Sequence, residues 1–295
     1  MRRLDSGEEK NSFFIGKAET AGRKIFQPDT VSAAILKIRF WGGIGWAAPS
    51  MPLVTQTLDT RSGELVETLR STAHDAKVTT IVPRSDDIVA IRIEKASGFV
   101  VDLTRPEDVR LAGSPDWKWE EGVISFVQSA PGGEKYAVAL ALKSARKSVF
   151  KEPGPLVRRL ESGGETELFL AVRAFNEKGD ARAAAVAAAR AAQAKGYAAL
   201  SAANRAWWAD FWAKGGDARF PEQPEIERNW RFSLYALASS FGSAPMPGLN
   251  GLSYGPIDAA NPGVGSQGYN HDQNVQIPMV PFPMLGHPGF LESMA

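Results

Sequence analysis

The stretch NEKGDARAAAVAAARAAQAKGY, residues 176–197, divides the sequence into two parts of different character. Its first residues, Asn176–Asp180, are polar and typical of a turn, and the alanine-rich run Ala181–Ala194 follows directly. Alanine has the highest helix propensity of any residue, so this run predicts a helix, which ends near Lys195-Gly196. Strand-like segments precede the stretch and helical segments follow it, which indicates an α+β chain with its strands first.

The part before this stretch, from Phe13 to about Val172, has the pattern of a β-domain. Short β-branched segments recur there, with Pro, Gly and Asp between them. The clearest hairpin is TQTLDTRSGELVETL at residues 55–69, with Arg61-Ser-Gly63 as its turn. Many strands at short, regular spacing predict an antiparallel sandwich rather than βαβ units. The other predicted strands are Ala34–Phe40, Ile88–Ile93, Phe99–Leu103, Gly122–Gln128, Tyr136–Leu142 and Glu167–Val172.

Two further helices are predicted after Gly196. The first runs from about Tyr197 to Lys214, and we expect its apolar face to pack against the sandwich. The second covers about Pro224–Phe241, with a proline near its start, where a missing amide hydrogen costs nothing. Its apolar residues recur every three or four positions and predict one buried stripe. The apolar positions are Leu200, Trp207, Trp208, Phe211 and Trp212 on the first helix, and Ile226, Trp230, Leu234, Leu237 and Phe241 on the second.

The composition limits the classes of function. The chain has 295 residues, enough for two domains, and its 44% hydrophobic and 23% charged content is that of a soluble globular protein. With 34 basic and 33 acidic residues, the net charge of +1 argues against a nucleic-acid or anionic-membrane partner. No run of 18 apolar residues occurs, so no membrane insertion is expected. The absence of cysteine excludes disulfides, thiolate catalysis and zinc–thiolate sites.

A second unusual stretch lies within Pro245–Leu291 and includes PGLNGLSYGPIDAANPGVGSQGYNHDQNVQIPM. Its many uncharged hydrogen-bonding side chains, held on turns, suit a sugar-binding cleft, because each sugar hydroxyl needs a partner. The same composition is equally typical of a polar surface loop. The cluster Phe40–Trp46 could be a ligand loop, but core packing beside a glycine turn is the favoured interpretation.

The residues alone predict no cofactor and no metal site. One histidine beside one carboxylate, His271 and Asp272, is not a metal site, and His74 and His287 lie in unrelated contexts. In isolation Asp272 is typical of a turn or cap and His271 of a loop. The glycine string Gly263–Gly268 follows no predicted strand, so it is a weak dinucleotide signal, and no G-x-S-x-G motif is present.

Four segments, in this order, resemble glycoside hydrolase family 95, the inverting α-L-fucosidases with an (α/α)6 barrel. LDTRSGELV at residues 58–66 is similar to the family's N-terminal sandwich segment. GYAALSAANRAWWADFW at residues 196–212 is similar to its linker helix, which ends in a W-x-x-F/Y-W pattern. RNWRFSLYALASSF at residues 228–241 resembles its first barrel helix. The polar stretch supplies the fourth likeness, through Pro247–Leu252, Gly268–Ile277 and Phe290–Glu292.

The resemblance implies three parts: a β-sandwich over residues 1–175, a helical linker over 176–221, and the start of an (α/α)6 barrel over 222–295. It implies inverting hydrolysis of a terminal sugar from an oligosaccharide or polysaccharide. It also implies a location in the periplasm or outside the cell, although the N-terminal sequence MRRLDSGEEKNSFF has no apolar signal-peptide region. The barrel would be incomplete, and the general-acid glutamate would lie beyond Ala295. We therefore expect little or no hydrolase activity from this polypeptide by itself.

The correspondence within Gly268–Ile277 implies catalytic candidates. Asn274 matches the asparagine that holds the attacking water. Asp272 replaces another family asparagine, and as a carboxylate it could act as a neighbouring base or accept a sugar hydroxyl. Inverting chemistry needs acid and base roughly 6.5–9.5 Å apart. The substrate-binding candidates are Asn250, Tyr269, Asn270, His271 and Gln276.

Departures from the family pattern, such as Asp272, indicate a divergent branch. Glu292 matches a family glutamate that we interpret as structural or as lining a subsite. Two other functions fit the same residues: a glycoside phosphorylase on this scaffold, and a carbohydrate-binding protein without catalysis.

Overall fold

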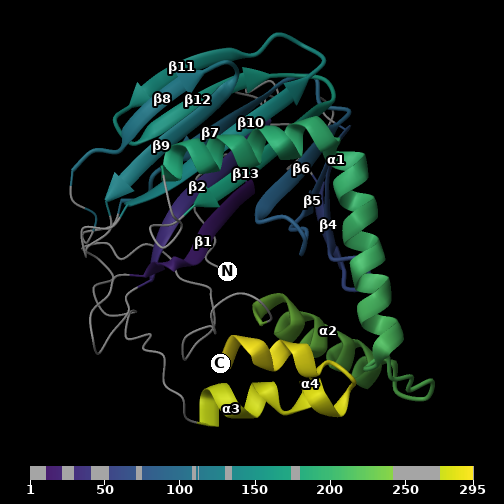
Figure 1. Ribbon diagram of the computed structural model, residues 1–295. Coiled ribbons are helices and arrows are strands. Elements are labelled where there is room, and N and C mark those ends of the chain that lie inside the picture. The colour runs from purple at the N-terminus through teal and green to yellow at the C-terminus, as the bar shows by residue number, and fades with distance from the viewer. Residues whose placement is uncertain are drawn as a thin grey trace.

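The computed structural model describes residues 11–21, 30–40, 53–70, 75–107, 111, 113–129, 135–173, 180–241 and 273–294. Within these ranges the chain forms thirteen strands and then its helices. All the strand pairs are antiparallel, and the strands make two sheets (Figure 1). The predicted order of strands before helices, and the predicted antiparallel sandwich, are therefore confirmed.

The small sheet and the large sheet include every strand that the sequence predicted. Gly63, at φ +66°, closes the predicted hairpin between β3 and β4. The small sheet has the order β1 (Asn11–Ala21), β2 (Thr30–Phe40), β7 (Phe99–Thr104), β12 (Val157–Ser162) and β11 (Val149–Gly154). The large sheet has the order β3 (Leu53–Asp59), β4 (Glu64–Arg70), β5 (Asp75–Ile81), β6 (Ile88–Glu94), β13 (Thr166–Arg173), β10 (Lys135–Ser144), β9 (Val123–Ser129) and β8 (Asp116–Glu120).

Strand β10 shows how the large sheet uses both of its faces. Its larger residues Tyr136, Val138 and Leu140 belong to the buried core between the sheets, together with Phe99 and Leu103 of β7. The alternate residues of the strand are alanines, and they face the opposite side, because successive side chains in a strand point to opposite faces. A strand buried on both faces explains why Tyr136–Leu142 is an almost continuous apolar run.

Helix α1 (Ala181–Lys214) covers that second face with its first half. Ala185, Ala189 and Ala192 pack in one cluster with Ala139 of β10 and Phe169 of β13. Small side chains on both surfaces let the helix lie close to the sheet, so this half of the molecule has three layers (Figure 1). The alanine-rich composition thus serves packing as well as helix propensity.

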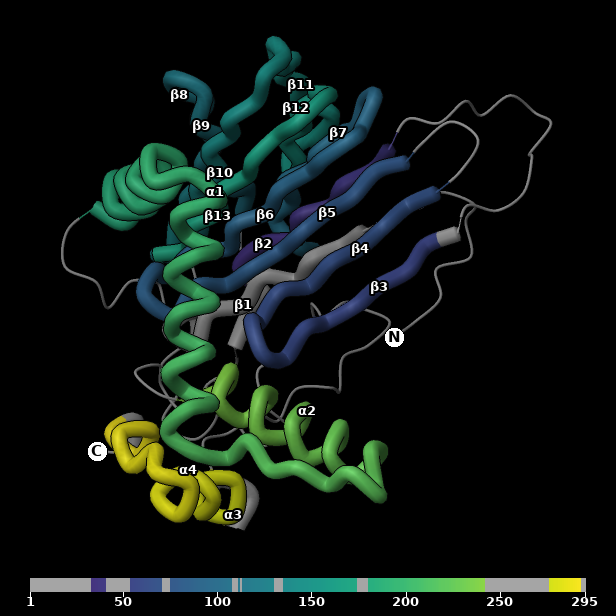
Figure 2. Tube along the Cα trace, turned by 90° about the vertical axis from the view of Figure 1, so that its right-hand side faces the viewer, coloured from purple at the N-terminus to yellow at the C-terminus, as the bar shows by residue number. Residues whose placement is uncertain are grey.

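The predicted break in this helical region is a kink in α1 at Gly196. This residue has φ +78° and ψ 158°, a conformation that glycine adopts readily and other residues avoid. Asp180 caps the first half by accepting hydrogen bonds from the backbone N–H groups of Arg182 and Ala183. After the kink, the second half leaves the sheet and runs to the C-terminal helices (Figure 2).

The aromatic face of this second half packs only in part as predicted. Leu200 does join the cluster under the sandwich, but Trp208, Phe211 and Trp212 pack in a separate helical cluster. Trp208 and Trp212 also contact the β3–β4 turn of the sandwich, so the expectation holds in part. Periodicity identifies a buried face but not all of its partners. The remaining elements are α2 (Pro224–Ser240), α3 (Gln273–Met279), α4 (Pro281–Met284) and the 3-10 helix η1 (Pro288–Met294), and the helical cluster also contains Leu234, Ala238, Phe241, Met279, Phe282 and Phe290.

The predicted stripe on α2 is only partly buried. Leu234 and Phe241 lie in the helical cluster, and Leu237 packs against it. Ile226 and Trp230, nearer the start of the helix, keep 50% and 39% of their surface exposed. The cluster reaches only the later turns of α2, so the expectation of a fully buried stripe is wrong within the described part of the chain. None of the described helices is both long and apolar enough to cross a membrane.

Candidate functional site

Most of the predicted site residues fall outside the described ranges. This is true of Asn250, Tyr269, Asn270, His271 and Asp272. The loop candidate Phe40–Trp46 is likewise outside them after Phe40, which ends β2.

Asn274 and Gln276 are both in α3, and the side chain of Gln276 is exposed. Glu292 is exposed on η1. The catalytic assignment therefore stays a prediction.

The described residues form a pocket where the sandwich meets the helices. Its volume is about 390 Å³, which is at the lower end of the roughly 300–1,000 Å³ of small-molecule pockets. Three segments distant in sequence make its wall: the β5–β6 connection, the second half of α1, and residues 286–290, which lead from α4 into the first turn of η1. The lining side chains are those of Arg84, Trp207, Asp210, Phe211, Lys214, His287, Pro288 and Phe290.

The apolar wall of this pocket is a stack of rings. The rings of Trp207 and Phe211 are nearly parallel, with centroids 5.6 Å apart. The imidazole of His287 stacks on Phe211 with centroids 4.1 Å apart, and its Nε2 is 3.3 Å from the carbonyl oxygen of Gly215. His287, which had no evident context in the sequence, is thus a buried member of an aromatic cluster.

Arg84 forms the cationic side of the pocket. Its guanidinium carbon lies 5.0 Å from the ring centroid of Trp207 and 5.6 Å from that of Phe290. One Nη2–H donates to the carbonyl oxygen of Phe241 at 2.7 Å, which ties the sandwich to the end of α2. Burial lowers the pKa of Arg84 from its ordinary value, although the guanidinium stays protonated at neutral pH.

The rim of the pocket carries an ion pair within α1. Lys214 Nζ lies 2.7 Å from Asp210 Oδ2, one helical turn earlier, and both side chains are largely exposed. Such exposed pairs contribute little to stability, about 0–1 kcal/mol, so both groups are available to a ligand. Among the described residues, no group of three or more His, Asp or Glu side chains could hold a metal ion.

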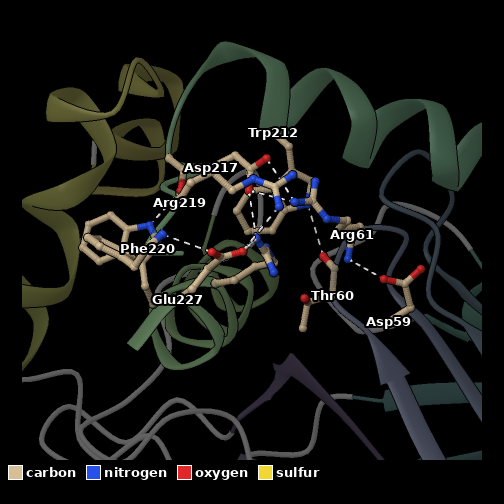
Figure 3. Close-up of polar contacts among 11 residues, drawn as sticks. Asp59, Thr60, Arg61, Trp212, Asp217, Arg219, Phe220 and Glu227 are labelled. Carbon is tan, nitrogen blue, oxygen red and sulfur yellow. Dashed lines mark hydrogen bonds and ion pairs between the residues drawn. The ribbon is translucent and has the colours of Figure 1, made fainter. Parts of the chain in front are cut away.

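A polar network beside the pocket positions the helices against the sandwich (Figure 3). Arg61, in the β3–β4 turn, donates from Nη2 to both oxygens of Asp217 at 3.1 Å. Asp217 also accepts from Arg231 of α2, which binds Glu227 at 2.7 Å. The hydrogen bond from Arg231, followed by that from the Phe220 N–H, holds the pKa of Glu227 below its ordinary value.

The same turn also docks on α1. The indole N–H of Trp212 donates to the carbonyl oxygen of Thr60 at 3.1 Å, and Asn204 Nδ2 donates to that of Ser62 at 2.6 Å. Glu64 accepts from the hydroxyl of Ser201 at 2.7 Å and from Arg205. The hairpin segment LDTRSGELV is therefore a docking point for α1, which gives a structural reason for its polar turn.

In structure, most of the chain is similar to carbohydrate-active enzymes. A presumed kojibiose phosphorylase from the human microbiome gives a TM-score of 0.60 at 10% sequence identity, over 82% of this chain and 37% of that chain. A family GH92 α-mannosidase from Bacteroides thetaiotaomicron gives a TM-score of 0.46 at 9% identity, over 78% of this chain and 35% of that chain. A bacterial glucoamylase complexed with acarbose gives a TM-score of 0.46 at 12% identity, over 81% of this chain and 43% of that chain. No protein-family model and no curated protein matches the sequence.

The likeness to the presumed phosphorylase shows a shared fold over the aligned part. This chain spans 37% of the length of that protein. Membership of glycoside hydrolase family 95, and specificity for fucose, stay predictions.

The sequence could predict some contacts among the pocket residues but not others. Trp207 and Phe211 are four positions apart on a predicted helix, so a common face was predictable. Nothing in the sequence placed Arg84 or His287 beside them, because those contacts join segments far apart along the chain.

Proposed function

We propose that this chain belongs to a glycoside hydrolase that releases a terminal sugar from an oligosaccharide or polysaccharide. The observation that carries the proposal is the shared fold: the chain gives a TM-score of 0.60 with a presumed kojibiose phosphorylase over 82% of its residues. The order of sandwich, kinked helix and helical segment also supports the proposal. Fucose is the first substrate to test, and inversion is the proposed stereochemical outcome.

The proposed chemistry uses the polar stretch around α3. Asn274 positions the attacking water, and Asp272 either accepts a proton from that water or accepts a hydrogen bond from a sugar hydroxyl. Asn250, Tyr269, Asn270, His271 and Gln276 bind the sugar. These residues include no general acid, so turnover requires a proton donor from outside the candidate set.

A second candidate function is a glycoside phosphorylase. The observation in its favour is that the structure with a TM-score of 0.60 is described as a phosphorylase. Phosphate would then replace water as the nucleophile at the same anomeric carbon. A carbohydrate-binding protein without catalysis is the third candidate. It would use the same sugar-binding residues, but Asp272 would not act as a base.

The experiment combines binding with turnover. Saturation-transfer NMR of the 295-residue chain would be run against L-fucose, D-galactose and kojibiose, with Asn274→Ala and Asp272→Asn as variants. Aryl fucosides and galactosides would be assayed with and without inorganic phosphate. We expect saccharide binding that Asn274→Ala weakens, and little turnover by this chain alone. Absence of binding to every saccharide would contradict the proposal, and phosphate-dependent release of a sugar 1-phosphate would favour the phosphorylase.

A further inference from the structure

Arg84 is a partly buried cation for which the described residues provide no carboxylate. Its neighbours there are two aromatic faces and one backbone carbonyl, on Trp207, Phe290 and Phe241. A guanidinium has five N–H donors, and removing it from water is costly unless they are satisfied. Ring faces offset part of that cost. Arg84 lines a pocket of about 390 Å³.

The other lining groups narrow the chemistry of that ligand. Lys214 is a second cation on the wall, and Asp210, its ion-pair partner, offers carboxylate oxygens that accept from hydroxyl groups. Trp207, which is half-buried beside Arg84 and Phe211, adds apolar surface to the wall. Guanidinium groups match carboxylate and phosphate geometry with two parallel hydrogen bonds. The combination suits a small ring that carries both hydroxyls and one anionic group.

We propose that this pocket binds a monosaccharide bearing a carboxylate or a phosphate, with the anionic group on Arg84 and Lys214 and the sugar hydroxyls on Asp210. The sugar part of this ligand rests on the proposed function. The described lining of this pocket includes none of the residues of the predicted sugar site. It would recognise an acidic unit of a substrate, or a free sugar acid or sugar phosphate.

The direct test is a comparison of ligands on the intact 295-residue chain. Glucuronate, glucose 6-phosphate, glucose and inorganic phosphate would be titrated by calorimetry and by saturation-transfer NMR at low and high salt. We expect both charged sugars to bind at least about tenfold more tightly than glucose, and this advantage to shrink as salt screens the contact. Preference for glucuronate over glucose 6-phosphate would identify an acidic sugar unit, and the reverse a sugar phosphate. Equal binding of glucose, or binding of inorganic phosphate as tight as that of the sugar phosphate, would overturn the proposal.

Three variants locate the site. Arg84→Gln and Lys214→Gln remove the two cations in turn, and Arg228→Gln is the control, because Arg228 is an exposed arginine paired with Glu225 on α2. We expect the first two to lose most of the charged-sugar binding and the control to keep it. Circular dichroism would check folding, since Arg84 also holds Phe241. If Arg84→Gln does not fold, Lys214→Gln and the salt dependence decide, and unchanged binding in Lys214→Gln would overturn the proposal.

These measurements separate this inference from the proposed function. Loss of charged-sugar binding at Arg84 leaves binding of neutral saccharides at residues 250–276 untouched. Conversely, absence of neutral saccharide binding contradicts the proposed function without affecting the comparison of glucuronate with glucose.

Discussion

The indole of Trp208 packs against Gly63, so that α1 and the β3–β4 turn meet without a side chain between them. A Cβ atom at Gly63 would lie 3.0 Å from Cδ1 and 3.1 Å from Cε2 of that ring, and closer still to Nε1. Gly63 also has φ +66°, which disfavours any other residue. Two independent constraints therefore require glycine at the point where α1 contacts the sandwich.

Replacement of Gly63 by alanine should destabilise the protein. Strain at positive φ and a clash with Trp208 should together cost about 1–3 kcal/mol of unfolding free energy. Gly113→Ala is the matched control, because Gly113 has φ +72° and a Cβ atom added there would have no neighbouring atom within 4 Å. Urea denaturation of both variants isolates the contact with Trp208, and equal losses would show that the contact contributes nothing.

Replacement of Gly196 by alanine should disturb the kink in α1. The φ of +78° and ψ of 158° fit glycine and strain other residues, at a cost on the order of 1–3 kcal/mol. An alanine here favours a continuous helix, which would pull Trp208 away from Gly63. Thermal unfolding should show a lower midpoint, and near-ultraviolet circular dichroism should report a changed tryptophan environment. An unchanged midpoint would mean that α1 accepts a straight path.

Phe282 should be a major contributor to the helical cluster. It is fully buried and stacks on Phe290 with centroids 4.4 Å apart. Phe282→Ala should cost about 3–5 kcal/mol, whereas Met284→Ala, in the same short helix but with 77% of its surface exposed, should change stability by less than about 0.5 kcal/mol. Comparison of the two by guanidinium denaturation tests the packing of α4. Similar losses for both would contradict the observed burial.

Glu67 should lower the free energy of unfolding at neutral pH, and acidification should remove this effect. Its carboxyl group is buried on β4, and burial raises its pKa above the ordinary 4.5 against the lowering effect of the Gln56 hydrogen bond. A raised pKa means that the folded state favours the protonated form. The destabilising effect of the charge is therefore present above the folded pKa and is relieved as the pH falls toward 4.5.

The variant Glu67→Gln should consequently be more stable than the original chain at neutral pH, and this advantage should vanish in acid. Glu94→Gln, an exchange of the same kind in the neighbouring strand pair, is the control. Unfolding free energies measured from pH 7 down to pH 4 give the comparison, and an advantage that grows in acid would contradict the sign.

The sequence predicted what depends on neighbouring residues and missed what depends on distant ones. The alternation in Ile88–Ile93, the alanine run and Gly196 are local signals, and each gave the correct element. The partners of Trp208 and Phe211 depend on how α2 and η1 return to α1, which no local pattern states. Arg84 had no signal at all, because its role arises from packing across segments far apart in the sequence. Asp272 and its neighbours lie outside the described residues, so their roles remain predictions.

The kink at Gly196 has a further consequence for how this helix can evolve. Its first half is anchored on the sheet, and its second half presents Trp208 to Gly63 and Trp212 to Thr60. An inserted or deleted residue between Gly196 and Asn204 would turn everything beyond it by about 100° and displace it by about 1.5 Å. Outward-facing positions there can change identity freely. The number of residues between Gly196 and Asn204 is fixed, because the contacts beyond this segment depend on it.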